Sequence, residues 1–201
     1  MSDLKLAVLI SGNGSNLQAL IDACAQSDFP AQISLVISNN PDAYGLHRAR
    51  DAGIKAVIIN HKDYNSRGEF EDEIQAALDK QPIDLICLAG FMRILTPSFV
   101  ERWPDRILNT HPSLLPKFGG EGMYGMNVHK AVIEAGETET GCSIHYVIPE
   151  VDQGPVILQK TVSVRPEDTP EILAERVVAR EHIAYPEAIR LLAGEKLQKQ
   201  A

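Results

Sequence analysis

The chain has 201 residues, of which 44% are hydrophobic and 23% are charged, so it is long enough for one domain with a sizeable core. Asp and Glu number 27 against 19 Lys and Arg, and the resulting formal net charge of −8 argues against a general nucleic-acid binder. A small anionic ligand stays compatible with this charge, because backbone N–H groups can hold a phosphate locally.

The chain opens with a strand and a turn. Residues 6–10 form a continuous apolar run, which is typical of a strand buried on both faces of a parallel sheet. A turn with two glycines follows over residues 11–16. Ser15 is then predicted to cap a helix, with Gln18 completing a capping box. The apolar stripe of this helix consists of Leu17, Leu20, Ile21 and Cys24.

The same strand–helix unit repeats up to about residue 105. Further elements are predicted as strands over 33–37, 56–59 and 84–88 and as helices over 43–52 and from Ser66, where Glu69 completes a second capping box. This rhythm indicates an α/β fold: a doubly wound, mostly parallel, Rossmann-like sheet. Ligands of such sheets bind at the carboxyl ends of the strands.

The pattern changes beyond residue 105. A strand at residues 107–108 leads into a Pro/Gly-rich segment over 110–125, and segments this long without regular structure are usually functional. Two more strands, over 143–148 and 156–164, predict an antiparallel C-terminal extension. A long C-terminal helix is predicted to start near Thr169, with Pro186 expected to kink or interrupt it. No repeat or linker divides the chain, so we expect a single domain over residues 1–201.

The turn at residues 11–16 favours phosphate binding. Its glycines permit positive φ and close backbone approach, and the next helix offers free N–H groups. It is not a complete dinucleotide motif, because Leu17 replaces the third glycine and no acid follows the second strand to hold a ribose. The turn also lacks the lysine of a P-loop. These features argue against a nicotinamide enzyme or an NTPase and leave an ordinary tight turn as the alternative.

Asn109 and His111 are the candidate catalytic residues. Alternation places both side chains on one side if the strand at 107–108 continues through them, at the strand end where α/β active sites lie. Asp152 lies in a turn between the last two strands. Taken alone, His111 fits a structural histidine, and Asp152 fits a turn former.

The cysteines and the N-terminal run favour a cytoplasmic protein. The chain has three cysteines, and their odd number without a C-x-x-C pair suggests a reducing compartment. Buried structural thiols are the expectation for all three, Cys24, Cys87 and Cys142. The apolar run at residues 4–10 is too short for a membrane span and lacks a cleavage site. We therefore expect no membrane association.

Four segments in the same order resemble the folate-dependent glycinamide ribonucleotide formyltransferases over nearly the whole chain. They are residues 11–17 (SGNGSNL), 90–95 (GFMRIL), 109–116 (NTHPSLLP) and 141–154, which ends in Asp152-x-Gly154. The resemblance implies formyl transfer from 10-formyltetrahydrofolate, the co-substrate, to the amine of glycinamide ribonucleotide in de novo purine biosynthesis, without a metal. It also implies a phosphate-binding half at 1–105 and a catalytic, folate-binding half at 106–201.

The same resemblance assigns roles to individual residues. Asn109 and His111 would face the developing oxyanion, and Asp152 would pair with His111 and favour its charged form. The residues implied in binding the substrate's phosphate and ribose are Gly14, Ser15, Asn16 and Glu181. The residues implied in binding folate are Arg67, Met92, Arg93, Ile94, Leu95, Ile148 and Val151. Taken alone, Glu181 and Arg67 fit solvent-exposed helix charges better.

One segment departs from the family pattern. Residues 118–129 hold four glycines within seven residues, which suggests a mobile lid, and His129 is expected in place of the later histidine of the family. Glu121 lies in this segment without an assigned role.

Other readings of the same motifs stay open. A sugar-nucleotide formyltransferase would share them. Formyltetrahydrofolate hydrolase has an added N-terminal domain, for which a first strand at residue 4 leaves no room. Methionyl-tRNA formyltransferase has an extra C-terminal domain and needs a basic surface. A non-catalytic nucleotide-binding module would not need Asn109, His111 and Asp152. We expect small-molecule partners and no nucleic acid, with a homodimer left possible.

Overall fold

The protein is built on one continuous seven-stranded sheet. The computed structural model describes residues 3–200, with side chains described through residue 194. The strands lie in the order β3-β2-β1-β4-β5-β6-β7. Their bounds are β1 (Leu4–Ile10), β2 (Ala31–Ser38), β3 (Ala56–Ile58), β4 (Leu85–Leu88), β5 (Ile107–His111), β6 (Glu139–Tyr146) and β7 (Val156–Ser163). The first five are parallel, and β6 and β7 are antiparallel to their neighbours.

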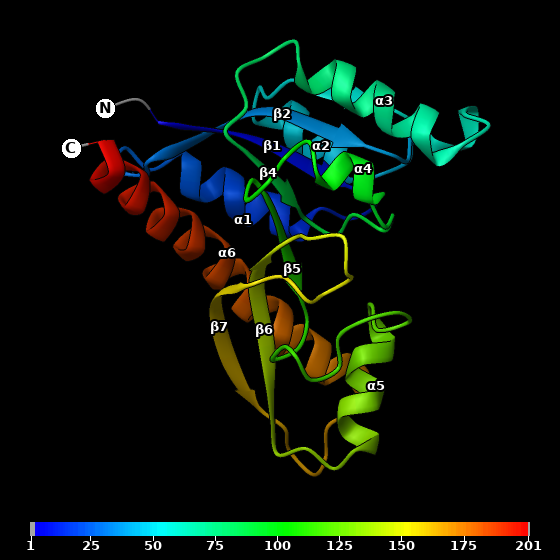
Figure 1. The fold of residues 1–201 in the computed structure, drawn as a ribbon. Helices are drawn as coiled ribbons and strands as arrows, with labels where there is room; N and C mark the ends of the chain where they lie inside the picture. The colour runs from blue at the N-terminus through cyan, green and yellow to red at the C-terminus, as the bar shows by residue number, and fades with distance from the viewer. Residues whose placement is uncertain (1–2, 201) are drawn as a thin grey trace.

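The helices cover both faces of this sheet (Figure 1). Their bounds are α1 (Ser15–Cys24), α2 (Gly45–Asp51), α3 (Arg67–Leu78), α4 (Pro97–Val100), α5 (Met126–Glu134) and α6 (Pro170–Gln200), with a short 3-10 turn η1 (His61–Asp63). One hydrophobic cluster joins the sheet to α1, α2, α5 and α6, and a second joins the opposite face to α3 and α4. The predicted doubly wound α/β fold with an antiparallel extension and a long C-terminal helix is confirmed.

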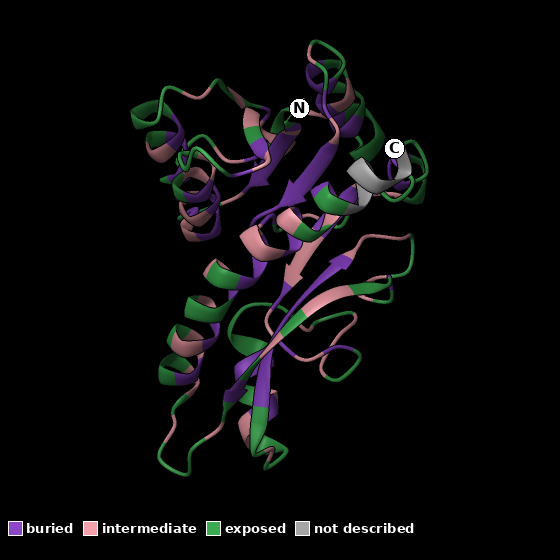
Figure 2. Ribbon diagram, turned by 90° about the vertical axis from the view of Figure 1, so that its left-hand side faces the viewer, coloured by how far each residue is buried: buried purple, intermediate pink, exposed green. Residues whose placement is uncertain are grey.

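The central parallel strands β1 and β4 are buried on both faces because helices pack on each side (Figure 2). β1 lies at the centre, between β2 and β4, and Leu6 through Ile10 have no exposed surface. Such burial explains the continuous apolar run over these residues. The carboxyl ends of β1 and β4 lie beside one another, so the loops that follow them meet at one edge of the sheet.

The helix starts agree only in part with the predicted caps. Ser66 caps α3 as predicted, because its side chain accepts a hydrogen bond from the N–H of Glu69. The prediction for α1 is wrong: the helix begins at Ser15, and the cap is Gly14 in the left-handed region at φ 73, without a side-chain bond. The capping residue of α1 therefore provides no side-chain acceptor for the N–H groups of the first turn.

The C-terminal half corrects two further predictions. α6 continues through Pro186 without interruption. Proline removes only one intrahelical hydrogen bond, and Ala184, Tyr185, Ala188 and Ile189 beside it are fully buried, so packing holds the helix. β6 begins at Glu139, four residues before its predicted start. Position 141 of this strand requires glycine, because a Cβ there would meet the backbone carbonyl of Lys160 on β7.

Candidate functional site

Asn109 and His111 lie on β5, which is longer than predicted. β5 continues to His111 because it pairs with β6, where Asn109 lies opposite His145 and His111 opposite Ser143. The condition for placing Asn109 and His111 on one side of the strand is therefore met. His111 is 3% exposed, and Asn109 is half-buried.

Asp152 lies beside His111, although 41 positions separate them in the sequence. Its Oδ2 is 3.4 Å from Nδ1 of His111, and its side chain is 10% exposed. The same oxygen accepts a hydrogen bond of 3.0 Å from the N–H of Gly120. Asp152 adopts φ 57, a left-handed conformation that Asp and Asn tolerate better than most residues. The turn between β6 and β7 thus brings a carboxylate to the end of β5.

His111 also contacts the glycine-rich loop. Its Nε2 lies 2.8 Å from the carbonyl oxygen of Phe118, which can only accept, so this nitrogen donates. Each nitrogen of the ring therefore faces an oxygen, from Asp152 on one side and Phe118 on the other. The Phe118 carbonyl already accepts the hydrogen bond from the Nε2–H of His111. The loop has to move before this donor becomes available to a ligand oxygen.

His145 is a member of this cluster that the sequence reasoning missed. Its Nδ1 lies 2.9 Å from the carbonyl oxygen of Tyr146, so Nδ1 holds the proton and Nε2 accepts. That acceptor lies 3.2 Å from Nδ2 of Asn109. Burial lowers the pKa of His145, although the Tyr146 carbonyl and Asp152 oppose the shift. A neutral His145 thereby fixes the side-chain amide of Asn109.

The signal that could have identified His145 is its place in the strand. It follows Ser143 by two residues in an apolar strand that the sequence already predicted. A polar ring in such a strand needs a partner, and the neighbouring strand offers Asn109. One sequence does not give the pairing register between the two strands, so it does not identify Asn109 as the partner of His145.

The N-terminus of α1 and the middle of α6 meet in a second polar group. Nδ2 of Asn16 donates a hydrogen bond of 2.7 Å to Oε2 of Glu181. Glu181 is only 5% exposed, which contradicts a solvent-exposed helix charge at this position. Burial raises its pKa, and the bond from Asn16 opposes the shift. Gly14, Ser15 and Asn16 lie at the start of α1, so these four predicted residues come together.

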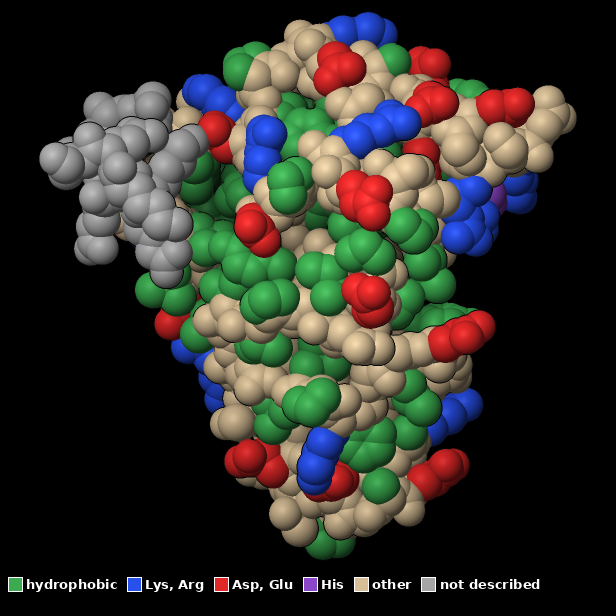
Figure 3. Space-filling model, viewed as in Figure 1, with side chains coloured by type: hydrophobic (Ala, Val, Ile, Leu, Met, Phe, Trp, Pro, Cys, Tyr) green, Lys and Arg blue, Asp and Glu red, His purple; other side chains and the backbone are tan. Residues whose placement is uncertain are grey.

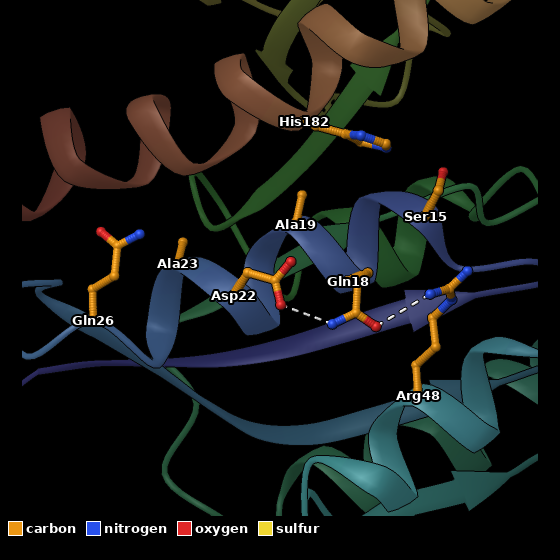
Figure 4. A pocket seen from close by; sticks show the side chains of 8 residues that line it. All are labelled: Ser15, Gln18, Ala19, Asp22, Ala23, Gln26, Arg48 and His182. Carbon is orange, nitrogen blue, oxygen red and sulfur yellow. Dashed lines mark hydrogen bonds between the residues drawn. The ribbon is translucent and has the colours of Figure 1, made fainter.

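A cavity of about 440 Å³ lies beside this group (Figure 4). It is lined by Ser15, Gln18, Ala19, Asp22, Ala23, Gln26, Arg48 and His182. They come from α1, α2 and α6, except for Gln26, which follows α1. In the described part of the chain, the cluster around His111 does not line it. The cavity thus adjoins the predicted phosphate-binding turn and not the candidate catalytic residues.

The residues predicted to bind folate lie in three places. Residues 91–96 form an irregular segment after β4, with Met92 and Ile94 60% and 53% exposed and Leu95 buried. The N–H of Met92 donates a hydrogen bond of 2.8 Å to Oγ of Ser11, which joins this segment to the phosphate-binding turn. Ile148 and Val151, both half-buried, precede Asp152 in the turn after β6.

The last of these folate residues, Arg67, is exposed at the first position of α3. Among the described residues, no hydrogen bond or ion pair joins it to the His111 cluster. A helix N-terminal surface charge, the reading that its position alone favoured, fits this exposure.

Cys87 and Cys142 are buried, and Cys24 is half-buried. All three are unpaired in the described chain. Burial raises the pKa of Cys24 to about 11 and those of Cys87 and Cys142 to about 12. Thiols with such pKa values are protonated near neutral pH and are poor nucleophiles. The expectation of structural cysteines is supported.

The described residues offer neither a metal-binding cluster nor a helix suited to crossing a membrane. Residues 3–200 hold no group of three or more His, Cys, Asp or Glu side chains placed to bind a metal ion. The helices of the same residues include none with the length and apolar character that a membrane crossing requires.

Comparison with known proteins places the chain among formyl transferases. The model of that family matches residues 4–189. The phosphoribosylglycinamide formyltransferase of Haemophilus influenzae is 45% identical over 194 residues, which cover 96% of this chain and 89% of the relative. The trifunctional purine biosynthetic protein adenosine-3 of Gallus gallus is 48% identical over 97% of this chain. The chain spans about a fifth of that relative, 19%.

A solved structure is similar over almost the same length. The phosphoribosylglycinamide formyltransferase of Coxiella burnetii, in complex with CHES, shares 48% identity and a TM-score of 0.88. The match covers 96% of this chain and 88% of that one.

Proposed function

The chain belongs to the formyl transferase family, and from this premise we propose that it transfers a formyl group from 10-formyltetrahydrofolate to the amine of glycinamide ribonucleotide, a step of purine biosynthesis. The observation that carries the proposal is the convergence of a carboxylate, an imidazole and an amide, from Asp152, His111 and Asn109, at the end of β5. The names of the similar proteins supply the acceptor, phosphoribosylglycinamide, and the formyl group that is transferred.

Asn109 and His111 stabilise the charge that develops during transfer. 10-Formyltetrahydrofolate supplies the electrophilic formyl carbon, and negative charge grows on the formyl oxygen as the amine attacks. One N–H of Asn109 is held by His145, and the second is left to donate to that oxygen. His111 adds its Nε2 proton once the Phe118 carbonyl moves away. Donors aimed at a charge that exists only near the transition state increase kcat.

Asp152 orients His111 and takes part in proton transfer. The attacking amine loses a proton, and the departing folate nitrogen gains one. The carboxylate beside Nδ1 of His111 fixes the orientation of the ring, so that Nε2 presents its proton as a donor. Asp152, His111 and a bound water are all candidates for the proton route. The hydrogen bond from Gly120 and the left-handed turn hold this carboxylate in place.

The turn at residues 11–16 and Glu181 bind the acceptor. The N–H groups of Ser15, Asn16 and Leu17 at the start of α1 donate to the phosphate, and Gly14 allows the close approach. The carboxylate of Glu181, oriented by Asn16, accepts hydrogen bonds from the ribose hydroxyls. These assignments support a phosphorylated amine as the acceptor.

The folate ring lies against the segment after β4. An irregular backbone offers donors and acceptors to the pterin edge, and the exposed Met92 and Ile94 offer apolar contact. Arg93, Leu95, Ile148 and Val151 complete the walls, and Arg67 interacts with the folate tail. This fit of apolar surface and backbone polar groups is what pterin recognition requires. We propose that the protein acts in the cytoplasm on small molecules, as its unpaired cysteines suggest.

The assay that tests the proposal mixes purified protein with 10-formyltetrahydrofolate, with and without glycinamide ribonucleotide. Tetrahydrofolate should appear only when the acceptor is present. Release without acceptor would support a formyltetrahydrofolate hydrolase, and release only with an amino-sugar nucleotide would support a sugar-nucleotide formyltransferase. No release in any mixture would support a non-catalytic module. Asp152→Asn should lower kcat by about 10²-fold or more while the far-UV circular dichroism stays unchanged.

A further inference from the structure

Arg48 on α2 binds the turn that the proposed acceptor site uses. Its Nε donates to the carbonyl oxygen of Asn13 at 2.9 Å, and its Nη2 donates to Oδ1 of the same residue at 3.0 Å. Its Nη1 donates to Oε1 of Gln18, in the first turn of α1, at 3.2 Å. The guanidinium also lies over the ring of Tyr44, 4.9 Å from the ring centre. One side chain thus connects the middle of the turn to the first turn of α1.

The backbone of α2 presses against the same turn. The N–H of Gly45 donates to the carbonyl oxygen of Gly12 at 3.1 Å. A Cβ on Gly14 would lie 2.8 Å from the Cα of Gly45, so neither position has room for a larger residue. α2 therefore supports the shape of residues 12–14, and Arg48 is the side chain that extends this support into α1.

Arg48 also brings a positive charge to the cavity beside the turn. Figure 4 shows its guanidinium and the Ser15 side chain at the same end of this cavity. Asp22 lines the cavity further along α1. On the face in Figure 3, Lys and Arg lie interspersed with Asp and Glu, and the whole chain has a net charge of −8. Because the chain as a whole is negative, the attraction of a phosphate dianion to this place depends on the local positive charge of Arg48.

We infer that Arg48 is a positioning residue for the acceptor's phosphate: it fixes residues 13–18 so that the N–H groups of α1 converge, and it adds charge beside them. The inference rests on the proposed function. Three of its N–H groups already bind Asn13 and Gln18, so Arg48 acts mainly through the turn. Lysine would supply the charge without the planar fork that makes these contacts.

The test compares two acceptors, glycinamide ribonucleotide and its dephosphorylated riboside, in the parent and in Arg48→Met. We expect KM for the ribonucleotide to rise about tenfold or more, with kcat changed less than about twofold. KM for the riboside should stay within about twofold. A purely structural role would affect both acceptors equally, and that result, or an unchanged KM, would overturn the inference.

Two matched variants sharpen this result. Arg48→Lys should lose most of the preference for the phosphorylated acceptor, and full retention would show that the guanidinium fork is not needed. Arg50→Met is the control, because Arg50 is exposed on the same helix and its side chain bonds only to His47 among the described residues. Its KM values should match the parent's for both acceptors.

A binding measurement separates this inference from the proposed function. Inorganic phosphate should raise the melting temperature of the parent and of Arg50→Met, and the rise should be largely lost in Arg48→Met. Equal stabilisation of all three proteins would reject the role of Arg48 even if the enzyme formylates glycinamide ribonucleotide. Loss in Arg48→Met without any formyl transfer by the parent would reject the proposed reaction and keep the phosphate site.

Discussion

Glu181 serves acceptor binding in the proposed function, but burial of its carboxylate lowers the stability of the fold. Glu181 is 5% exposed, and its carboxylate accepts a hydrogen bond from Asn16. Burial raises its pKa above the ordinary value of 4.5. Below about pH 4.5 the folded and unfolded forms are both protonated. Above it the unfolded form loses its proton first, so stability falls as pH rises until the folded carboxyl also ionises.

Glu181→Gln should remove this loss while weakening acceptor binding. Gln keeps an oxygen for Asn16 and has no charge to desolvate. We expect its free energy of unfolding to exceed the parent's by an amount that grows as pH rises from about 4.5, at up to about 1.4 kcal/mol per pH unit. Urea unfolding at several pH values measures this difference. A variant whose advantage is constant with pH would show that Glu181 does not titrate with an altered pKa.

His129 on α5 shows the opposite dependence. It is 3% exposed, and its Nδ1 has no hydrogen-bond partner among the described residues. Burial lowers its pKa below 6.5, and the charge of His111 adds to the shift. The folded form therefore stays neutral where the unfolded form takes up a proton. Its contribution to stability is complete above about pH 6.5 and is lost as pH falls through the lowered pKa.

His129→Gln should make the acid side of the stability profile less steep. Between about pH 6.5 and the lowered pKa, the parent loses up to about 1.4 kcal/mol per pH unit more than the variant. Thermal unfolding followed from pH 8 to pH 5 tests this. His47→Gln is the control, because His47 is exposed, and its profile should follow the parent's. Parallel profiles for parent and His129→Gln would contradict the prediction.

Asn109, His111 and Asp152 of the His111 cluster were predicted from the sequence. What could not be predicted depends on contacts between distant parts of the chain. Strand alternation and the known edge of an α/β sheet place Asn109 and His111 together. Asp152 was found by resemblance, because contact between residues 41 positions apart depends on the turn after β6 and its left-handed backbone. His145 was missed because strand register depends on pairing between β5 and β6, which composition does not reveal.

The glycine-rich loop is the element that connects backbone shape to the cluster. Phe118 and Gly120 contact His111 and Asp152 through their main-chain atoms. Gly119 lies between them, and a Cβ there would be 2.6 Å from Cδ2 of Leu115 and 3.2 Å from Cβ of Asp152. A side chain at this position would displace the end of the Leu115 side chain and push the loop away from Asp152.

Gly119→Ala should therefore lower kcat about tenfold or more, because the shift moves both contacts to the cluster. KM for the acceptor should change little, since the turn at residues 11–16 is untouched. Gly68→Ala is the control, because a Cβ on this α3 residue would meet nothing closer than 3.9 Å. Steady-state kinetics of both variants decide the matter, and normal kcat in Gly119→Ala would show that the loop tolerates displacement.

Periodicity predicted where elements lie better than how they end. The apolar runs of β1 and β4 and the Ser66 cap of α3 were correct because they depend on local chemistry. The cap of α1 was wrong because Gly14 is pressed against Gly45 of α2. The interruption at Pro186 was wrong because burial of the surrounding helix offsets one lost hydrogen bond. Tertiary contacts decided both cases.

α6 is the element that connects the two halves of the chain. It packs against α1 and β2 of the parallel part and against β6, β7 and α5 of the rest. The hydroxyl of Tyr185 donates to the carbonyl oxygens of Leu88 and Leu108, so this buried side chain also joins α6 to β4 and β5. One sheet runs through both hydrophobic clusters. We therefore predict that the halves unfold together as one domain.

Leu173→Ala tests this cooperativity. Leu173 on α6 is fully buried in the cluster with β6, whereas Trp103, the only tryptophan of the chain, lies in the cluster on the other face of the sheet. Removing the side chain should cost about 2–5 kcal/mol. If the molecule is one unit, tryptophan fluorescence and far-UV circular dichroism shift by the same amount, although Trp103 is remote from the substitution.

The matched control for this measurement is Leu191→Ala on the same helix. Leu191 is 47% exposed, so its truncation should change the free energy of unfolding by no more than about 0.5 kcal/mol. A Trp103 transition that stays at the parent's midpoint in Leu173→Ala, while the circular dichroism transition moves, would divide the chain into two folding units. Coincident transitions require that the stability contributed by α6 reaches the far face through the strands between them, since β1 and β4 supply side chains to both clusters.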